Sequence, residues 1–149
     1  MGYESAILDF TDLRSEKSYD KLREYRKSKL ANILFSIELQ RRITKNGNHV
    51  LSIAAQSGAN NTALTRHSTQ EEISIGKERI GDFMEPSQGA PSTLYAAVSN
   101  QALGAKMYEP DQGYRGYPVP ATLRGNALDE TAVRKLYEFS TLATNLQFP

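Results

Sequence analysis

The chain has 149 residues, enough for a single domain with a hydrophobic core of ordinary size. Its formal net charge is only +1, so the composition indicates neither nucleic acid nor an acidic membrane surface as a partner. The absence of cysteine excludes disulfides and thiolate metal sites, and it is typical of a cytoplasmic protein. No apolar stretch approaches the roughly 20 residues that a membrane span needs, so none is expected.

Residues 1–24 carry charges of both signs and are predicted to form an irregular lead-in loop. Seven cationic residues lie close together between Arg14 and Lys29, which makes a basic nucleic-acid surface an alternative. Four acidic residues are interleaved with them between Asp12 and Glu24 and cancel much of that field. We therefore expect no nucleic-acid partner.

Residues 25–46 are predicted to form a long amphipathic helix, because apolar residues recur there at steps of three and four. These apolar positions are Leu30, Ile33, Leu34, Ile37 and Ile43. The helix is expected to end near Asn46 and Gly47, where a glycine follows cationic residues. Tyr25 and Lys29 stand four residues apart, so both side chains project from the same face of this helix.

A phenol beside an ammonium group loses its proton more easily than a free phenol does. For catalysis at neutral pH the phenolate needs roughly 4 kcal/mol of extra stabilisation. One ammonium at ~4 Å supplies about that much at an effective dielectric constant near 20, but only ~1 kcal/mol in open water. The Tyr25–Lys29 pair is therefore predicted to be useful only where something covers it.

Residues 50–55 form a short apolar run, which predicts a buried strand of a parallel sheet. Ligands of open α/β sheets bind beyond the carboxyl ends of the strands, so residues 56–62 occupy a candidate functional position. In this segment Gly58 permits close approach of the backbone, and Thr62 supplies a hydroxyl group. A simple turn at the end of the strand explains the same residues, and the pattern alone leaves both readings open.

Residues 63–99 are predicted to contain two helices. The first follows two overlapping capping boxes, Ser68 with Glu71 and Thr69 with Glu72. The second covers residues 86–99, with Pro91 bending or delaying its start. Its inward positions are expected to be Ala90, Leu94, Ala97 and Val98.

The remaining residues are predicted to form a loop and a last helix. Residues 114–120 are punctuated by glycine and proline and are interpreted as a surface loop. Asp129 opens the last helix, with Val133, Leu136, Tyr137 and Ser140 on one stripe. The two histidines, His49 and His67, have no partners at ligand spacing, so no metal site is expected.

The segment from Tyr25 through Ser28-Lys29-Leu30-Ala31-Asn32 to Glu38-Leu39 closely resembles the catalytic helix of the short-chain dehydrogenase/reductase family. The match is closest to the retinol-dehydrogenase-like branch. The resemblance extends from about Ile7 to Phe148. It includes Gly58 and Thr62 in the loop that lies against the nicotinamide, a variable substrate-covering region over residues 63–99, and a last strand near residues 104–109.

The resemblance implies an α/β fold, as the C-terminal part of a Rossmann-like, doubly wound domain. About two parallel strands and three to four helices are expected, in one domain over residues 1–149. It also implies NAD or NADP as cofactor and an alcohol or carbonyl compound as substrate. Tyr25 is then the catalytic acid or base, and Lys29 activates it and binds the nicotinamide ribose. The helix that carries Tyr25 is expected to associate with a second copy.

The sequence departs from the family pattern in three places. It contains no Gly-x-x-x-Gly-x-Gly motif, and no residue matches the family's catalytic serine. Gln56 and Ser57 stand where this branch has histidine and proline, so the nicotinamide loop is expected to be less rigid. Cofactor binding by this chain alone is therefore expected to be weak. The alternatives are a non-catalytic interaction module that pairs with itself or with a full-length relative, and a gene fragment without a function of its own.

Overall fold

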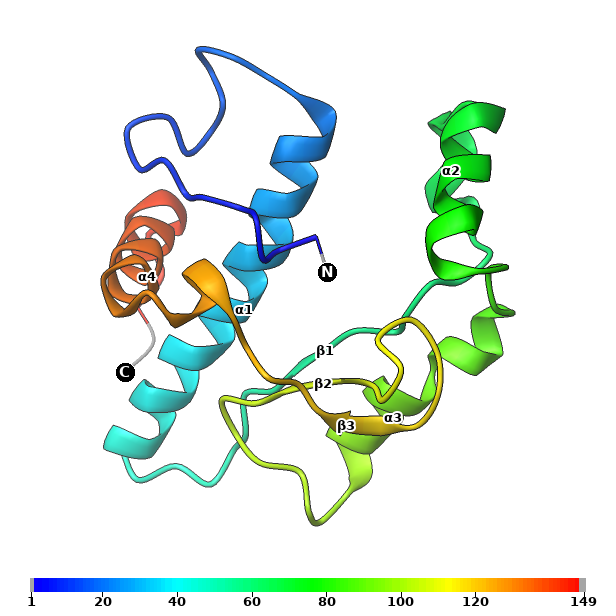
Figure 1. Cartoon of the computed structure of the whole chain (residues 1–149). Coiled ribbons are helices and arrows are strands. Elements are labelled where there is room, and N and C mark those ends of the chain that lie inside the picture. Colours follow the sequence, from blue (N-terminus) through cyan, green and yellow to red (C-terminus); the bar gives the residue numbers. More distant parts are fainter. Residues whose placement is uncertain (1, 148–149) are drawn as a thin grey trace. The chain divides into compact units, whose positions relative to one another are not determined.

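The computed structural model describes residues 2–147, whose helices and strands are shown in Figure 1. They divide into two compact units. The first comprises Met1–Ala54, Leu103–Met107 and Thr122–Pro149, and the second comprises Ala55–Ala102 and Tyr108–Ala121. Each unit is assembled from segments that are distant in the sequence.

Helix α1 (Lys21–Lys45) is the longest helix among the described residues. It begins four residues before its predicted start, because the Asp20 carboxylate accepts a hydrogen bond from the Arg23 amide at 2.8 Å and caps the helix. The lead-in loop accordingly ends at Asp20. The helix stops where the sequence predicted, with Asn46 as its C-cap and Gly47 at φ 70°.

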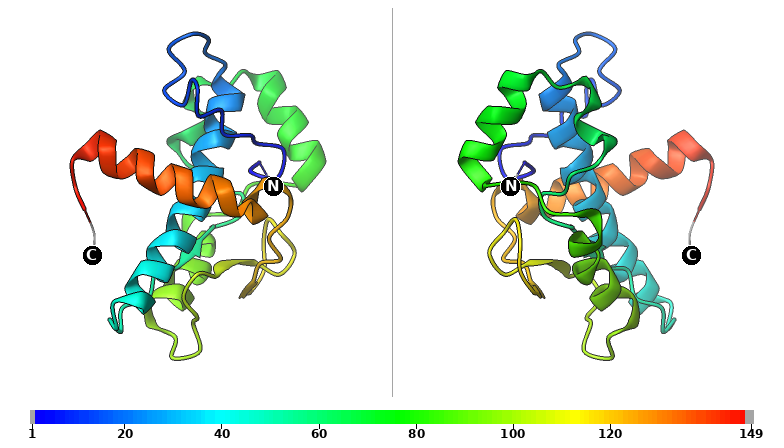
Figure 2. Two further views of the ribbon diagram at one scale, coloured as in Figure 1. Left: turned by 90° about the vertical axis from the view of Figure 1, so that its left-hand side faces the viewer. Right: turned by 90° about the vertical axis from the view of Figure 1, so that its right-hand side faces the viewer.

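The first unit is built around the contact between α1 and α4 (Glu130–Thr144). Figure 2 shows α4 lying across α1. The predicted apolar face of α1 is confirmed, because Leu30 and Leu34 are both fully buried. The predicted stripe of α4 is confirmed as well: Val133, Leu136 and Tyr137 are each at most 5% exposed.

A helix cap and an aromatic contact contribute to the packing of α4 on α1. The Asp129 side chain accepts hydrogen bonds from the amides of Thr131 and Ala132, which caps α4 as its acidic start predicted. On the facing helix, the Phe35 ring stacks on Tyr137 with 5.4 Å between centroids. The two helices are therefore held in register by aromatic as well as aliphatic contacts.

The sheet has the strand order β1 (Ala54–Ala55), β2 (Met107–Pro110), β3 (Pro118–Pro120). The Ala54 amide donates to the Lys106 carbonyl at 3.0 Å, and two residues later Gln56 donates to Tyr108 at 2.9 Å, which is a parallel pattern. β3 runs antiparallel to β2. The predicted α/β class is confirmed, with a small mixed sheet.

One loop prediction and one strand prediction need correction. Residues 114–120 were predicted as a loop, yet their last three residues form β3, because the glycines before them reverse the chain against β2. The strand predicted over residues 50–55 is only two residues long. Val50 is 67% exposed and Leu51 is 50% exposed, so this part is not the buried strand that its apolar character suggested. The Ser52 amide bonds instead to the Gln40 side chain at 2.7 Å.

The helices of the second unit follow their capping signals. Of the two possible capping boxes, Thr69 with Glu72 is the one that forms, and it opens α2 (Gln70–Ile80). Helix α3 (Pro91–Val98) starts at Pro91, after a separate turn over Pro86–Gly89, so the proline delays the helix as predicted.

The buried face of α3 differs from the predicted one. Leu94 and Val98 are 56% and 79% exposed, whereas Ser92 is only 2% exposed. The Tyr95 ring contacts Tyr108 of β2 with 4.9 Å between centroids. Ser92 and Tyr95 share the packed face at a helical step of three, and Leu94 and Val98 lie on the outer side of the helix.

Candidate functional site

Tyr25 and Lys29 lie on successive turns of α1. The Lys29 ammonium nitrogen is 5.0 Å from the centroid of the Tyr25 ring, so the structure brings the two predicted residues together. Both side chains are exposed, and Tyr25 retains 43% of its accessible surface. The pair is therefore open to a ligand that approaches this face of the helix.

The exposure of this pair sets the strength of its electrostatic coupling. In water, a cation at such a distance changes the energy of a phenolate by only about 1 kcal/mol. No residue that the structure describes in the first unit buries the pair. Activation of the phenol therefore requires a cover in addition to Lys29.

Lys27 lies on the same turn of α1 as Tyr25 but has a different role. It is 7% exposed, and its ammonium nitrogen lies 2.9 Å from the Glu24 carboxylate and 3.1 Å from the Ser15 hydroxyl. In the sequence, Lys27 is one of the seven cationic residues between Arg14 and Lys29. Its spacing of three from Glu24 was the signal for an ion pair. Lys29 is thus available to a ligand, whereas Lys27 is buried and bound to Glu24 and Ser15.

This ion pair predicts a specific dependence of stability on pH. The bond from Lys27, followed by those from Ser15 and Arg23, lowers the pKa of Glu24 from 4.5 to about 2. Because the folded-state pKa is the lower one, the stabilisation is complete above pH 4.5 and is lost as the pH falls through about 2. Glu24→Gln is expected to remove this part of the pH dependence, measured by thermal unfolding at a series of pH values.

The matched control is Glu78→Gln, which changes an exposed carboxylate of α2. It is expected to leave the acid branch of the stability curve unchanged. An acid branch of equal steepness in wild type and Glu24→Gln would contradict the role given to this carboxylate.

Gly58 lies in the loop after β1, at φ +74°. A Cβ atom at this position would collide with the Tyr114 carbonyl oxygen. The loop therefore needs a glycine here, both for its conformation and for the close approach of another backbone segment. Thr62 is exposed, and its hydroxyl accepts a hydrogen bond from the Leu64 amide at 3.3 Å, which caps the turn Ala63–His67.

The four predicted site residues are divided between the two units. Tyr25 and Lys29 belong to the first unit, and Gly58 and Thr62 belong to the second. Within its own unit each pair has the local geometry just described. A cofactor site that combines all four stays a prediction.

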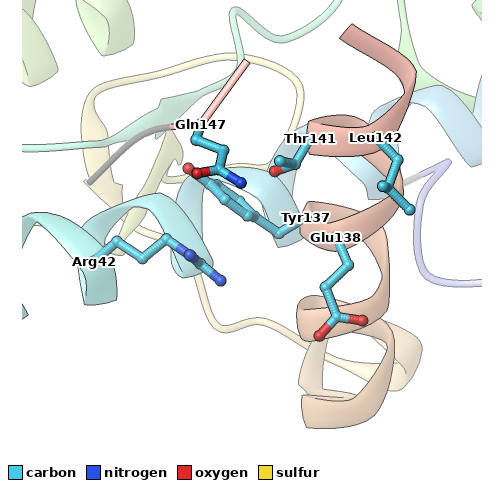
Figure 3. A pocket seen from close by; sticks show the side chains of 6 residues that line it. All are labelled: Arg42, Tyr137, Glu138, Thr141, Leu142 and Gln147. Carbon is cyan, nitrogen blue, oxygen red and sulfur yellow. The ribbon is translucent and has the colours of Figure 1, made fainter. Parts of the chain in front are cut away.

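The first unit has a cavity of about 500 Å³ between the end of α1 and the second half of α4 (Figure 3). The Arg42 guanidinium lies over the Tyr137 ring at 4.1 Å from its centroid, and its Nε donates to Glu38 at 3.1 Å. Neither Tyr25 nor Lys29 lines this cavity. The aromatic contact and the ion pair fix the arginine as a packing element of the α1–α4 interface.

Among residues 2–147, no group of three or more His, Asp or Glu side chains gathers as metal ligands would. Within the same range, no helix combines the length and the apolar character needed to cross a bilayer.

Comparisons with known proteins support an enzymatic relationship. No family model matches the chain. Human retinol dehydrogenase 14 is 33% identical over 150 residues, which cover 97% of this chain and 42% of that protein. A short-chain dehydrogenase/reductase of Emericella nidulans is 28% identical over 99 residues, which cover 63% of this chain and 32% of that protein.

One solved structure also matches the chain. The crystal structure of an uncharacterized protein from Mycobacterium Paratuberculosis matches with a TM-score of 0.77 and 31% identity. The match covers 100% of this chain and 49% of the other. The chain thus spans less than half the length of the proteins that it matches.

Proposed function

Because the chain belongs to the short-chain dehydrogenase/reductase family, we propose that it carries the proton-transfer pair and the nicotinamide-facing loop of an NAD(P)-dependent oxidoreductase acting on an alcohol or carbonyl compound. The observation that carries the proposal is the placement of Tyr25 and Lys29 side by side on one exposed face of α1. We further propose that the chain corresponds to the C-terminal part of such an enzyme, and that it is cytoplasmic, for which the absence of cysteine is the support.

In this proposal each residue has a chemical role. Tyr25 donates a proton to the carbonyl oxygen during reduction, or accepts it from the alcohol during oxidation. Lys29 stabilises the phenolate and donates a hydrogen bond to the nicotinamide ribose. The Gly58 backbone and the Thr62 hydroxyl line the nicotinamide. The cofactor, when bound, supplies or accepts the hydride.

The residues present fit only one end of that cofactor. The exposed Lys29 ammonium and the Tyr25 phenol are polar groups suited to a ribose, and the tight turn at Gly58 leaves backbone groups accessible. The printed sequence has no glycine-rich turn before a helix, the device that holds a pyrophosphate in this fold. Most of the binding energy for a dinucleotide would therefore have to come from residues outside this sequence.

We expect this chain alone to bind NADH only weakly, with no saturable binding at micromolar concentrations. The proposed site lacks the pyrophosphate cradle, and the Tyr25 and Lys29 side chains are exposed. The measurement is a titration followed by NADH emission, which is free of tryptophan background because the chain has none. A dissociation constant in the micromolar range would show that the chain holds a complete nucleotide site.

A chimaera tests the positive half of the proposal. In it, this chain replaces the matching 42% of human retinol dehydrogenase 14. The chimaera is expected to oxidise retinol with NAD or NADP, because the relative's remaining part supplies the nucleotide cradle and the cover that Tyr25 needs. A chimaera that folds and binds the cofactor but transfers no hydride would refute the roles of Tyr25 and Lys29.

A second candidate function is association without catalysis, with a second copy or with a full-length relative. The exposed apolar residues on α1 favour it: Leu22 is 54% exposed and Tyr25 is 43% exposed. Light scattering over a concentration series tests this reading. A stable monomer at high concentration would exclude self-association through this helix.

A further inference from the structure

The loop after β1 is held by side-chain amides. Its sequence predicted a loop less rigid than one with a proline, since Ser57 lacks the ring that fixes the φ angle of that residue. In the structure, the Gln56 Oε1 atom accepts a hydrogen bond from the Gly58 amide at 2.8 Å. A side chain thus closes the turn from within and fixes the backbone between the two residues.

The same Gln56 side chain also binds the segment on the other side of the loop. Its Nε2 atom donates to the Gly113 carbonyl at 2.8 Å and lies 3.4 Å from the Glu109 carboxylate. Next to this bond, the Ala59 amide donates to the Tyr114 carbonyl at 3.0 Å. Gln56 is half-buried, so these bonds are partly shielded from competing water. One amide therefore ties the loop to the β2–β3 connection.

The side-chain amide of Asn60 forms a second set of hydrogen bonds within this loop. Its Nδ2 atom donates to the Ser57 carbonyl at 2.9 Å and lies 3.0 Å from the Ser57 hydroxyl. The backbone on either side is also fixed, because Met84 donates to the Ala59 carbonyl and Asn61 donates to the Met84 carbonyl, at 2.9 and 2.8 Å. Ser57, the residue that lacks the proline restraint, is exposed, and the backbone around it is held by the side-chain amides of Gln56 and Asn60.

We propose that Gln56 is a positioning residue for the nicotinamide, acting through the Gly58 amide and the Gly113 carbonyl to hold residues 57–62 in one conformation. The inference rests on the proposed function, because it assigns a ligand to this loop. Gln56 does not touch the reacting atoms. It replaces a covalent restraint on the backbone by two hydrogen bonds, one accepted and one donated by the same amide.

The test uses the full ¹⁵N-labelled chain and three variants. Gln56→Leu removes both hydrogen bonds, and Gln56→Glu keeps the acceptor for Gly58 but loses the donor to Gly113. Gln101→Leu is the matched control, an exposed glutamine of the same unit. Amide hydrogen exchange at Gly58 and Ala59 reports on the loop. Millimolar NADH is the probe, followed by chemical-shift changes in residues 57–62.

We expect exchange at Gly58 to accelerate at least about ten-fold in Gln56→Leu and to stay unchanged in Gln101→Leu. Exchange is expected to accelerate in Gln56→Glu as well, because its carboxylate would face the Glu109 carboxylate and the Gly113 carbonyl. Millimolar NADH is expected to shift the loop resonances of wild type and Gln101→Leu but not those of Gln56→Leu. Unchanged exchange in Gln56→Leu would show that the Gln56 hydrogen bonds do not hold the loop. Faster exchange in Gln56→Leu, with no NADH shift even in wild type, would overturn the nicotinamide assignment while confirming that these hydrogen bonds hold the loop.

Discussion

Tyr25→Phe is expected to lower kcat of the chimaera by roughly 100- to 10,000-fold, the range that a positioned general acid or base supplies. The substitution removes only the hydroxyl group that gives or takes the proton. The ring that contacts Lys29 remains, so cofactor affinity and thermal stability should change little. The measurement is steady-state retinol oxidation, with cofactor binding determined separately. Tyr19→Phe is the matched control, because Tyr19 is 75% exposed in the lead-in loop.

The two neighbouring lysines separate catalysis from stability. Lys29→Met should lower kcat and raise KM for the cofactor, since its ammonium is free to serve both phenol and ribose. Lys27→Met should leave the Glu24 carboxylate without its buried partner and lower the melting temperature instead. A normal kcat in Tyr25→Phe, or equal kinetic effects of the two lysine variants, would remove the proposed reaction from this helix.

Leu34→Ala is expected to lower the free energy of unfolding by about 2–5 kcal/mol. The side chain is fully buried in the first unit, where α1 packs on α4, and its truncation leaves a cavity between them. The loss would be a large share of the roughly 5–15 kcal/mol that stabilises a typical domain. Chemical denaturation followed by far-ultraviolet circular dichroism measures it.

The matched control for this substitution is Leu22→Ala on the same helix. Leu22 is 54% exposed, so its truncation should cost no more than about 0.5 kcal/mol. Similar losses for the two variants would mean that the buried contact between α1 and α4 does not hold the first unit together.

The elements with a strong period were predictable from the sequence. Leu30, Leu34, Val133 and Leu136 recur at helical steps and carry the contact between α1 and α4, so the pattern identified both helices and their buried faces. The spacing of Tyr25 and Lys29 likewise placed them side by side, because a step of four on a helix fixes the direction of both side chains.

Elements set by contacts between distant segments were not predictable in this way. β3 forms because its residues pair with β2, and nothing within three residues rich in proline indicates a strand. The exposure of Leu94 and Val98 depends on which face of α3 packs against β2, and that face is set by the contact between Tyr95 and Tyr108. The hydrogen bond from Gln56 to Gly113 joins residues 57 positions apart. The sequence therefore showed that Ser57 stands in place of a proline, but not that a Gln56 hydrogen bond restrains the loop instead.

The composition of β3 limits how this protein can aggregate. β3 is an outer strand of the sheet, and two of its three residues, Pro118 and Pro120, have no amide hydrogen to offer to an incoming chain. Growth of an intermolecular sheet from this edge is therefore disfavoured. Prolines reduce pairing at the exposed edge strands of other proteins in the same way. Within the described residues, an intermolecular sheet would have to form at β1, the other outer strand. β1 has only two residues, both alanine, so it offers few hydrogen bonds and little side-chain contact to a second copy.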